Sequence, residues 1–198
     1  MIWRILFPLF GGSFEISKRP LTMKLRIRHF EEIGSTNDLA LEIVQKEKLS
    51  NDIAVIADVQ INGRGRLNGR VWHSPKGNFY CSYVLDLEDL SIPQNETNML
   101  TSEIISLLQQ YLKELTHSPR VTLKQPNDIF VDNKKLAGVL TEISYPYVVI
   151  GIGINLIVSP VEQATDLKSA FNLLVKPMDL VENLYEYMRT KLKECHSH

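Results

Sequence analysis

The sequence predicts an α+β domain built on a mixed, largely antiparallel sheet with flanking helices. Short apolar runs that favour strands follow one another in hairpin order through residues 121–154. Two longer segments, 97–115 and 178–194, carry leucines and other apolar residues at helical spacing. Strands in hairpin order with helices set among them are typical of the α+β class. The composition, 44% hydrophobic and 23% charged, is that of an ordinary globular protein.

The first half of the chain contains three predicted strands and one predicted helix. Residues 25–30 alternate between apolar and polar, as a half-buried strand does. The run Ser35-Thr36-Asn37-Asp38 is a dense helix-start signal, and apolar spacing continues the helix to about Lys48. Residues 53–57 and 79–87 are apolar and predict buried strands. Four of the ten glycines lie within residues 60–77, which therefore predict a loop.

The second half contains a long helix, four strands and a closing helix. After the helix at 97–115, a strand at 121–124 must break at Pro126, which turns Asn127 and Asp128 out of the ladder. Residues 129–131 and 135–143 form a hairpin around the polar turn 132–133. This turn returns the chain so that Lys135 lies near Asp128. A strongly apolar strand covers 147–154, and the last helix covers 178–194.

Charge and cysteine content exclude several classes of protein. Lys and Arg number 22 and Asp and Glu 23, so the net charge of −1 argues against binding nucleic acid by phosphate neutralisation. The two cysteines, Cys81 and Cys195, lie far apart, which argues against a disulfide scaffold or zinc finger and fits a reducing compartment. There is no run of 18 apolar residues to span a membrane. We therefore expect a cytoplasmic protein without a membrane partner.

The amino end is expected to stand apart from the fold. Residues 2–10 are apolar, but Arg4 and Pro8 interrupt them and no Ala-x-Ala site follows, which does not fit a secretory signal. We interpret residues 1–22 as an N-terminal extension and residues 23–198 as the functional domain.

The glycine-rich segment 63–70 is the first candidate for chemistry. It holds Arg64, Arg66 and Arg70 among glycines that let a backbone approach a ligand closely. Arginine offers a planar fork of donors that suits carboxylate and phosphate groups. Taken alone, the segment is equally well explained as a solvated basic turn. It matches neither the Walker phosphate loop nor the dinucleotide-binding fingerprint.

Two further segments carry polar groups at strand ends. In the first, KQPND at 124–128 is followed by KKLAG at 134–138, where a lysine could neutralise phosphates and a carboxylate could hold a metal ion beside it. In the second, GIGIN at 151–155 ends an apolar strand with an amide. An ordinary hairpin with exposed lysines and a close-packed, bent strand remain open as explanations.

The order of these segments resembles the catalytic domain of biotin–protein ligases. Ser35-Thr36-Asn37, Gln60 before GRGR, Gly69 to Trp72, KQPND, KLAG and GIGIN follow one another across residues 25–158. Lipoate–protein ligases share the fold but lack the GRGR loop. The resemblance implies a fold like that of class II aminoacyl-tRNA synthetases, a mixed sheet with helices on one side. It also implies activation of biotin by ATP, with Mg²⁺, to biotinyl-5′-AMP, and transfer to a lysine of a biotin carboxyl carrier protein.

The resemblance also assigns roles to individual residues. It implies catalytic roles for Lys135 and Arg64. The implied biotin-binding residues are Ser35, Thr36, Asn37, Gln60, Arg64, Gly65, Arg66, Lys135 and Gly138. The implied nucleotide-binding residues are Arg66, Arg70, Trp72, Asn127, Asp128 and Asn155, and Asp128 is the candidate metal ligand. A plain helix cap for Ser35 and Thr36, and plain core packing for Trp72, explain those residues as well.

The sequence departs from the family pattern in three respects. The loop holds one residue more between Arg66 and Arg70 than the commonest form, and Gln125 stands where tryptophan is usual. The third departure is that we expect no C-terminal β-barrel domain. We also expect no winged-helix domain and hence no nucleic-acid partner, and a homodimer is left open. Two alternative functions remain: a non-catalytic protein that binds biotin or its adenylate, and a lipoate or octanoate ligase.

Overall fold

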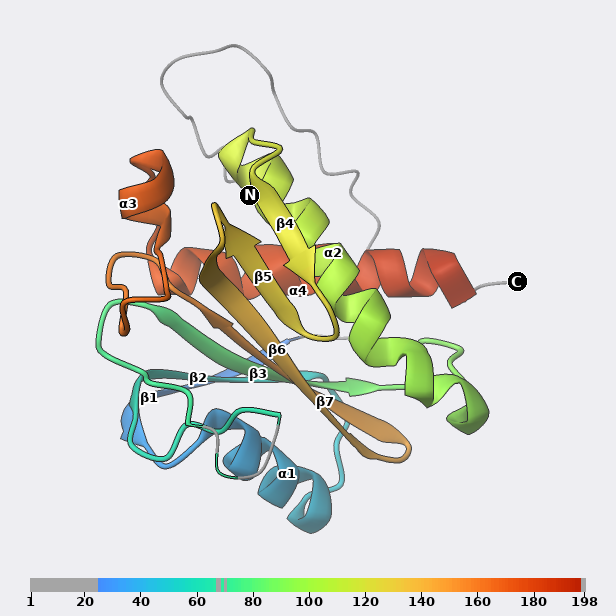
Figure 1. The fold of residues 1–198 in the computed structure, drawn as a ribbon. Helices are drawn as coiled ribbons and strands as arrows, with labels where there is room; N and C mark the ends of the chain where they lie inside the picture. The colour runs from blue at the N-terminus through green and yellow to red at the C-terminus, as the bar shows by residue number, and fades with distance from the viewer. Residues whose placement is uncertain (1–24, 67–68, 70, 197–198) are drawn as a thin grey trace, which may run out of the picture.

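The computed structural model describes residues 25–66, 69 and 71–196 (Figure 1). The strands are β1 (Arg26–Ile33), β2 (Ile53–Gln60), β3 (Phe79–Asp86), β4 (Val121–Lys124), β5 (Asp128–Val131), β6 (Lys134–Ser144) and β7 (Tyr147–Ile154). The helices are α1 (Thr36–Lys46), α2 (Leu100–Thr116), α3 (Leu167–Phe171) and α4 (Pro177–His196), and a 3₁₀ turn, η1 (Gln94–Met99), leads into α2. Residues 1–22 lie outside the described residues, so their interpretation as an extension stays a prediction.

The seven strands of the described residues form one sheet in the order β1-β2-β3-β7-β6-β5-β4. β1 and β2 pair in parallel, and the other neighbours pair antiparallel. β4 to β7 follow one another as the hairpins that the sequence predicts. The predicted α+β class with a mixed, largely antiparallel sheet is therefore confirmed.

Helices cover both faces of the sheet (Figure 1). α1 packs Ala40 and Ile43 against alternate residues of β2, among them Val55, which form a small core. The larger core lies on the other face of the sheet. There α2 and α4 cover the β2 residues that alternate with the first set, such as Ala54. Side chains alternate between the faces of a strand, so a central strand buried on both faces needs a helix on each side. The expectation of helices on one side only was therefore wrong.

The predicted elements occur with modest shifts at their ends. The first helix ends at Lys46 rather than near Lys48, and the second begins at Leu100 after η1. The short helix α3, capped by the Asp166 carboxylate, was not predicted, because five residues carry too little periodicity. Among the helices that the structure describes, none is long and apolar enough to cross a membrane.

Candidate active site

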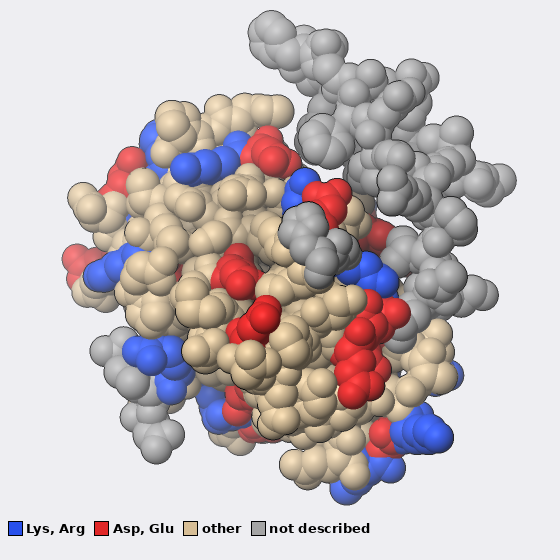
Figure 2. Space-filling view, turned by 90° about the vertical axis from the view of Figure 1, so that its right-hand side faces the viewer, with Lys and Arg blue, Asp and Glu red and all other residues tan. Residues whose placement is uncertain are grey.

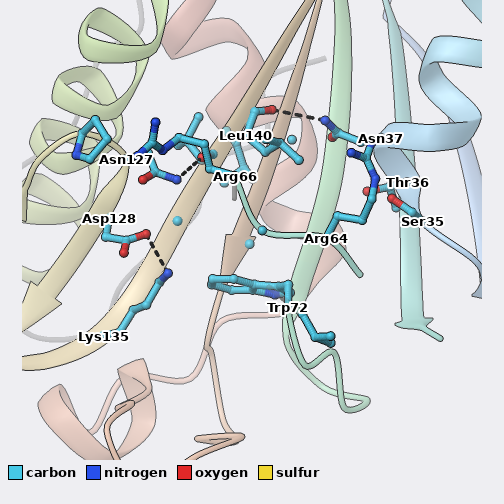
Figure 3. A pocket seen from close by; sticks show the side chains of 18 of the residues that line it. Ser35, Thr36, Asn37, Arg64, Arg66, Trp72, Asn127, Asp128, Lys135 and Leu140 are labelled. Carbon is cyan, nitrogen blue, oxygen red and sulfur yellow. Dashed lines mark hydrogen bonds and ion pairs between the residues drawn. The ribbon is translucent and has the colours of Figure 1, made fainter. Parts of the chain in front are cut away.

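One cavity of about 330 Å³ collects most of the predicted functional residues (Figure 3). It lies between the start of α1, the glycine-rich segment, the β4–β5 connection, the first half of β6 and the second half of β7. Its lining includes Ser35, Thr36, Asn37, Gln60, Arg64, Gly65, Arg66, Trp72, Asn127, Asp128, Lys135 and Gly138. Among the predicted site residues, Arg70 lies outside the described residues, and Asn155 does not line the cavity.

Hydrogen bonds fix the start of α1 at one end of the cavity. Ser35 caps the helix, accepting from the backbone N–H of Asp38 at 3.4 Å. The backbone N–H and the hydroxyl of Thr36 both donate to Gln60 Oε1, at 2.8 and 3.0 Å. Gln60 Nε2 in turn donates to Ser74 at 3.0 Å. Ser35 is thus the helix cap, and Ser35 and Thr36 both line the cavity, while their role in binding biotin stays a prediction.

Asn37 is buried and its amide is held by the protein. Its Nδ2 donates to Glu142 Oε2 at 2.7 Å and to the Leu140 carbonyl at 3.3 Å. The Ser82 hydroxyl lies 2.6 Å from Asn37 Oδ1. Gly151 makes this close approach possible, because a Cβ there would lie 2.0 Å from Asn37 Oδ1. Asn37 therefore shapes this wall through a fixed side chain.

The glycine-rich segment is anchored at its base. The backbone N–H of Trp72 donates to the Gly63 carbonyl at 2.9 Å, and Arg64 forms a β-bridge with Val71. The Arg64 guanidinium lies 2.5 Å from the Asp38 carboxylate and 3.0 Å from that of Glu142. Burial lowers the pKa of Arg64, but these two carboxylates together raise it above its usual value. Arg64 is therefore charged and is held against the start of α1.

Arg66 points the other way. It extends toward Asn127 at the opposite end of the cavity, while Arg64 extends toward Thr36 (Figure 3). Within the described part of the chain, no carboxylate forms an ion pair with Arg66. Arg66 is thus the arginine whose positive charge faces the cavity without a carboxylate partner there.

The Trp72 indole forms the floor between the two ends (Figure 3). Its ring packs on Gly153, where a Cβ would lie 2.5 Å from ring carbons, and against Gly138, where the distance would be 3.1 Å. The Lys135 ammonium lies 4.9 Å from the ring centre, within the range of a cation–π contact. Trp72 Nε1 is buried and, among the described residues, has no hydrogen-bond partner. Packing on these glycines thus explains where Trp72 lies, and its role in binding nucleotide stays a prediction.

Lys135 and Asp128 face each other at the charged end. Asp132 and Asn133 adopt left-handed backbone conformations, with φ of 49° and 65°, which suits the tight turn between β5 and β6. The turn brings Lys135 Nζ to 2.6 Å from Asp128 Oδ1, as the sequence predicts. The expectation that Pro126 turns Asp128 out of the ladder is wrong, since Asp128 begins β5 and pairs with Lys124.

Asn127, by contrast, does lie in the connection between β4 and β5. Its side chain donates to the Val139 carbonyl at 2.9 Å, and its own carbonyl accepts from the Val139 N–H at 2.9 Å. These two bonds tie the connection to β6. Asn127 therefore lines the cavity with its side chain held by hydrogen bonds to β6.

Asn155 is buried, with only 1% of its surface exposed. Its Nδ2 donates to the carbonyls of Thr165, at 3.0 Å, and Lys135, at 3.3 Å. The contact that Asn155 makes with the site is thus with the backbone of Lys135, and its role in binding nucleotide stays a prediction.

Sequence reasoning missed three residues that hold the site together. Ser82 lies on β3 at 0% exposure, Ser74 receives the bond from Gln60, and Glu142 on β6 pairs with both Asn37 and Arg64. The available signal was a polar residue within an apolar strand, as Ser82 is in the run Phe79–Asp86. Such a residue must find hydrogen-bond partners when it is buried.

The arrangement suits a ligand with one neutral polar end and one anionic end. Hydroxyl and amide groups surround the α1 end, where the charge of Arg64 is paired with Asp38 and Glu142, while Arg66, Lys124 and Lys135 bring positive charge to the other. Cations fixed around a reacting anion stabilise charge without reorganising during the reaction. No cluster of three metal-binding side chains occurs in the described ranges.

Comparison with known proteins identifies the family. The model of the biotin/lipoate A/B protein ligase family matches residues 29–155. The chain belongs to this family. The bifunctional ligase/repressor BirA of Bacillus subtilis is 34% identical over 146 residues, which are 71% of this chain and 43% of that protein. The biotin–[acetyl-CoA-carboxylase] ligase of Mycobacterium tuberculosis is 30% identical over 150 residues, which are 75% of this chain and 56% of that ligase. The chain thus spans about half the length of these relatives.

Solved structures of family members superpose well on the fold. The biotin protein ligase of Leishmania major in complex with biotinyl-5-AMP gives a TM-score of 0.74 at 27% identity, over 85% of this chain and 75% of that one. The ligase of Aquifex aeolicus in complex with biotin and ATP gives 0.70 at 29% identity, over 87% and 72%. The predicted resemblance to the family is confirmed.

Proposed function

We propose that the protein is an ATP-dependent biotin–protein ligase that makes biotinyl-5′-AMP and transfers biotin to a lysine of a biotin carboxyl carrier domain. The observation that carries the proposal is the cavity, which joins a neutral hydrogen-bonding end to a cationic end across one aromatic floor. Biotin has a neutral ureido ring and a carboxylate, and ATP brings the phosphates. Relatives of this fold bind biotin, biotinyl-5-AMP and ATP.

The first step joins two anions, so charge is its main obstacle. The biotin carboxylate attacks the α-phosphorus of ATP, forming the mixed anhydride and releasing pyrophosphate. Lys135, at the cationic end of the cavity, reduces the repulsion between carboxylate and phosphate. Arg66 supports the same charge from the glycine-rich segment. Ser35, Thr36, Asn37 and Gln60 hold the ureido end, which aligns the reactants.

In the second step, the amine of the acceptor lysine attacks the biotinyl carbonyl. An amide bond forms, the carbonyl–phosphate bond breaks, and AMP leaves while the amine releases a proton. No side chain of this chain acts as a nucleophile. Its groups keep the activated carbonyl in place and exclude water from it.

Mg²⁺ fits one carboxylate of the site. Asp128 lies on the cavity wall with one oxygen directed to Lys135, which leaves the other for a cation. Magnesium commonly uses one or two carboxylates together with substrate phosphates. Asp128 would therefore hold Mg²⁺ beside ATP, where the ion supplies further neutralisation of phosphate charge.

The proposal includes the cellular context. Free cysteines, buried Cys81 and exposed Cys195, suit the reducing cytoplasm. On the face shown in Figure 2, Lys and Arg occur in separate clusters with Asp and Glu between them, which does not favour a nucleic-acid partner. A homodimer is compatible with the proposal.

Pyrophosphate release tests the activity and separates the alternatives. We expect release with ATP and biotin together, and none when either is omitted. Lipoate or octanoate supporting release in place of biotin would favour the lipoate-type ligase. Biotin binding without release would favour a non-catalytic binding protein and would overturn the proposal.

A further inference from the structure

Glu142 lies outside the cavity, yet two residues of the cavity wall depend on its carboxylate. Its Oε2 accepts from Asn37 Nδ2 at 2.7 Å. The same carboxylate accepts from the Arg64 guanidinium at 3.0 and 3.2 Å. One side chain thus joins the start of α1, the base of the glycine-rich segment and β6.

We propose that Glu142 is a positioning residue that holds the Asn37 amide for biotin and the Arg64 guanidinium for the glycine-rich segment. The inference rests on the proposed function and deepens it. Glu142 thus contributes to the site although it does not line the cavity.

The Asn37 side chain depends on Glu142 for its short donor contact. The Leu140 carbonyl is a longer partner, at 3.3 Å, and carries no charge. Hydrogen bonds to a carboxylate are shorter and stronger than those between neutral groups. Ser82 and Gly151 fix the oxygen side of the amide, so Glu142 decides how firmly the nitrogen side is held.

Arg64 has two carboxylate partners that differ in their exposure. The Asp38 side chain is 53% exposed, whereas that of Glu142 is 26% exposed. The Asp38 contact is the shorter, at 2.5 Å against 3.0 Å, but water and salt screen this more exposed pair more strongly, so both carboxylates hold Arg64. Arg64 also forms the bridge with Val71 next to Trp72, so its fixation extends to the cavity floor.

We expect the Glu142 side chain to be dispensable for folding. The Glu142 backbone pairs with Val149 in the β6–β7 ladder, and this pairing is independent of the side chain. Substitution of Glu142 therefore separates positioning from folding, and a melting curve for each variant checks this.

Three variants separate the two contacts of Glu142. Glu142→Ala removes both, Glu142→Gln keeps an acceptor for Asn37 but removes the charge that holds Arg64, and Asp38→Asn weakens Arg64 alone. Glu31→Ala, at an exposed position of β1, serves as the control. Two quantities are measured: the biotin KM and kcat in pyrophosphate release, and hydrogen exchange of the Trp72 amide without ligand.

We expect Glu142→Ala to raise the biotin KM about tenfold, as for a lost charge-assisted hydrogen bond, with kcat changed less than about threefold. Glu142→Gln and Asp38→Asn should keep the biotin KM within about threefold, while all three variants speed exchange at Trp72. A KM in Glu142→Ala within about twofold of wild type, or an equal loss of kcat in all variants, would overturn the inference.

Failure of the proposed function is distinguishable from failure of this inference. If the wild-type protein releases no pyrophosphate, the proposed function fails, while Trp72 exchange still tests the anchoring of Arg64. If Glu142→Ala does not fold, Glu142→Gln decides, and unchanged exchange at Trp72 in that variant overturns the anchoring role.

Discussion

The ammonium of Lys135 lies 2.6 Å from the carboxylate of Asp128, across the hairpin formed by β5 and β6. The turn at Asp132 and Asn133 starts the pairing of the two strands, and a register shift between Ile129 and Phe130 then places Asp128 opposite Gly138. The pair is about one-third and one-fifth exposed, so it faces the cavity rather than the core. An anionic substrate can therefore reach Lys135 without unfolding any element.

Replacement of Lys135 tests its proposed catalytic role. Lys135→Ala should lower the rate of pyrophosphate release by about 10²–10³, because the cation between two anions is lost. Lys134→Ala is the matched control, since Lys134 is exposed and adjacent, and it should retain activity. If Lys135→Ala keeps more than about a tenth of wild-type activity, the loss is smaller than is typical for such a contact, and the assignment is contradicted.

Gly153 tests the place of Trp72 as the cavity floor. A Cβ at Gly153 would lie 2.5 Å from the indole, so Gly153→Ala must displace Trp72. We expect at least about a tenfold loss of activity and a loss of stability of about 1–3 kcal/mol, measured by urea unfolding. Gly34→Ala is the control, because nothing lies within 4 Å of a Cβ at that glycine. Equal activity in the two variants would show that the position of the indole is unimportant.

The raised pKa of Tyr111 predicts how the free energy of unfolding changes at alkaline pH. Burial, with a smaller effect of Glu114, raises its pKa from 10.0 to about 12. The unfolded chain thus loses its proton first, so this contribution to stability is complete below pH 10 and is lost as the pH rises toward 12. Tyr111→Phe should weaken the fall in unfolding free energy between these values by up to about 3 kcal/mol. An unchanged fall in the variant would assign it to other groups.

DNA binding tests the expectation of no nucleic-acid partner. With a net charge of −1, the protein should give no gel shift with duplex DNA at about 150 mM salt. Any retention at low salt should decrease on addition of biotin and ATP, because the arginines of segment 63–70 are then engaged. A sequence-specific shift stimulated by the ligands would contradict this expectation.

Patterns within a few residues predicted most of the fold, whereas the candidate site residues came from the family resemblance in the order of the motifs, and most of them line one cavity. The hairpin at Asp132 and Asn133 has a local turn signal, and the motifs around Lys135 and Arg64 lie in segments that contain their own glycines. The sequence did not predict that helices cover both faces of the sheet. This coverage depends on which of the two alternating sets of β2 side chains each helix packs against. Glu142 and Ser82 were missed for a similar reason: their partners lie 45 or more residues away, at Asn37 and Arg64.

The most direct measurement of the central claim is the intact mass of a biotin carboxyl carrier domain after incubation with the protein, ATP, Mg²⁺ and biotin. The account predicts the mass of one added biotinyl group on the acceptor lysine, with the addition absent when ATP is omitted and about 10²–10³ slower for Lys135→Ala. A carrier domain of unchanged mass, with the wild-type protein folded and biotin bound, would contradict it.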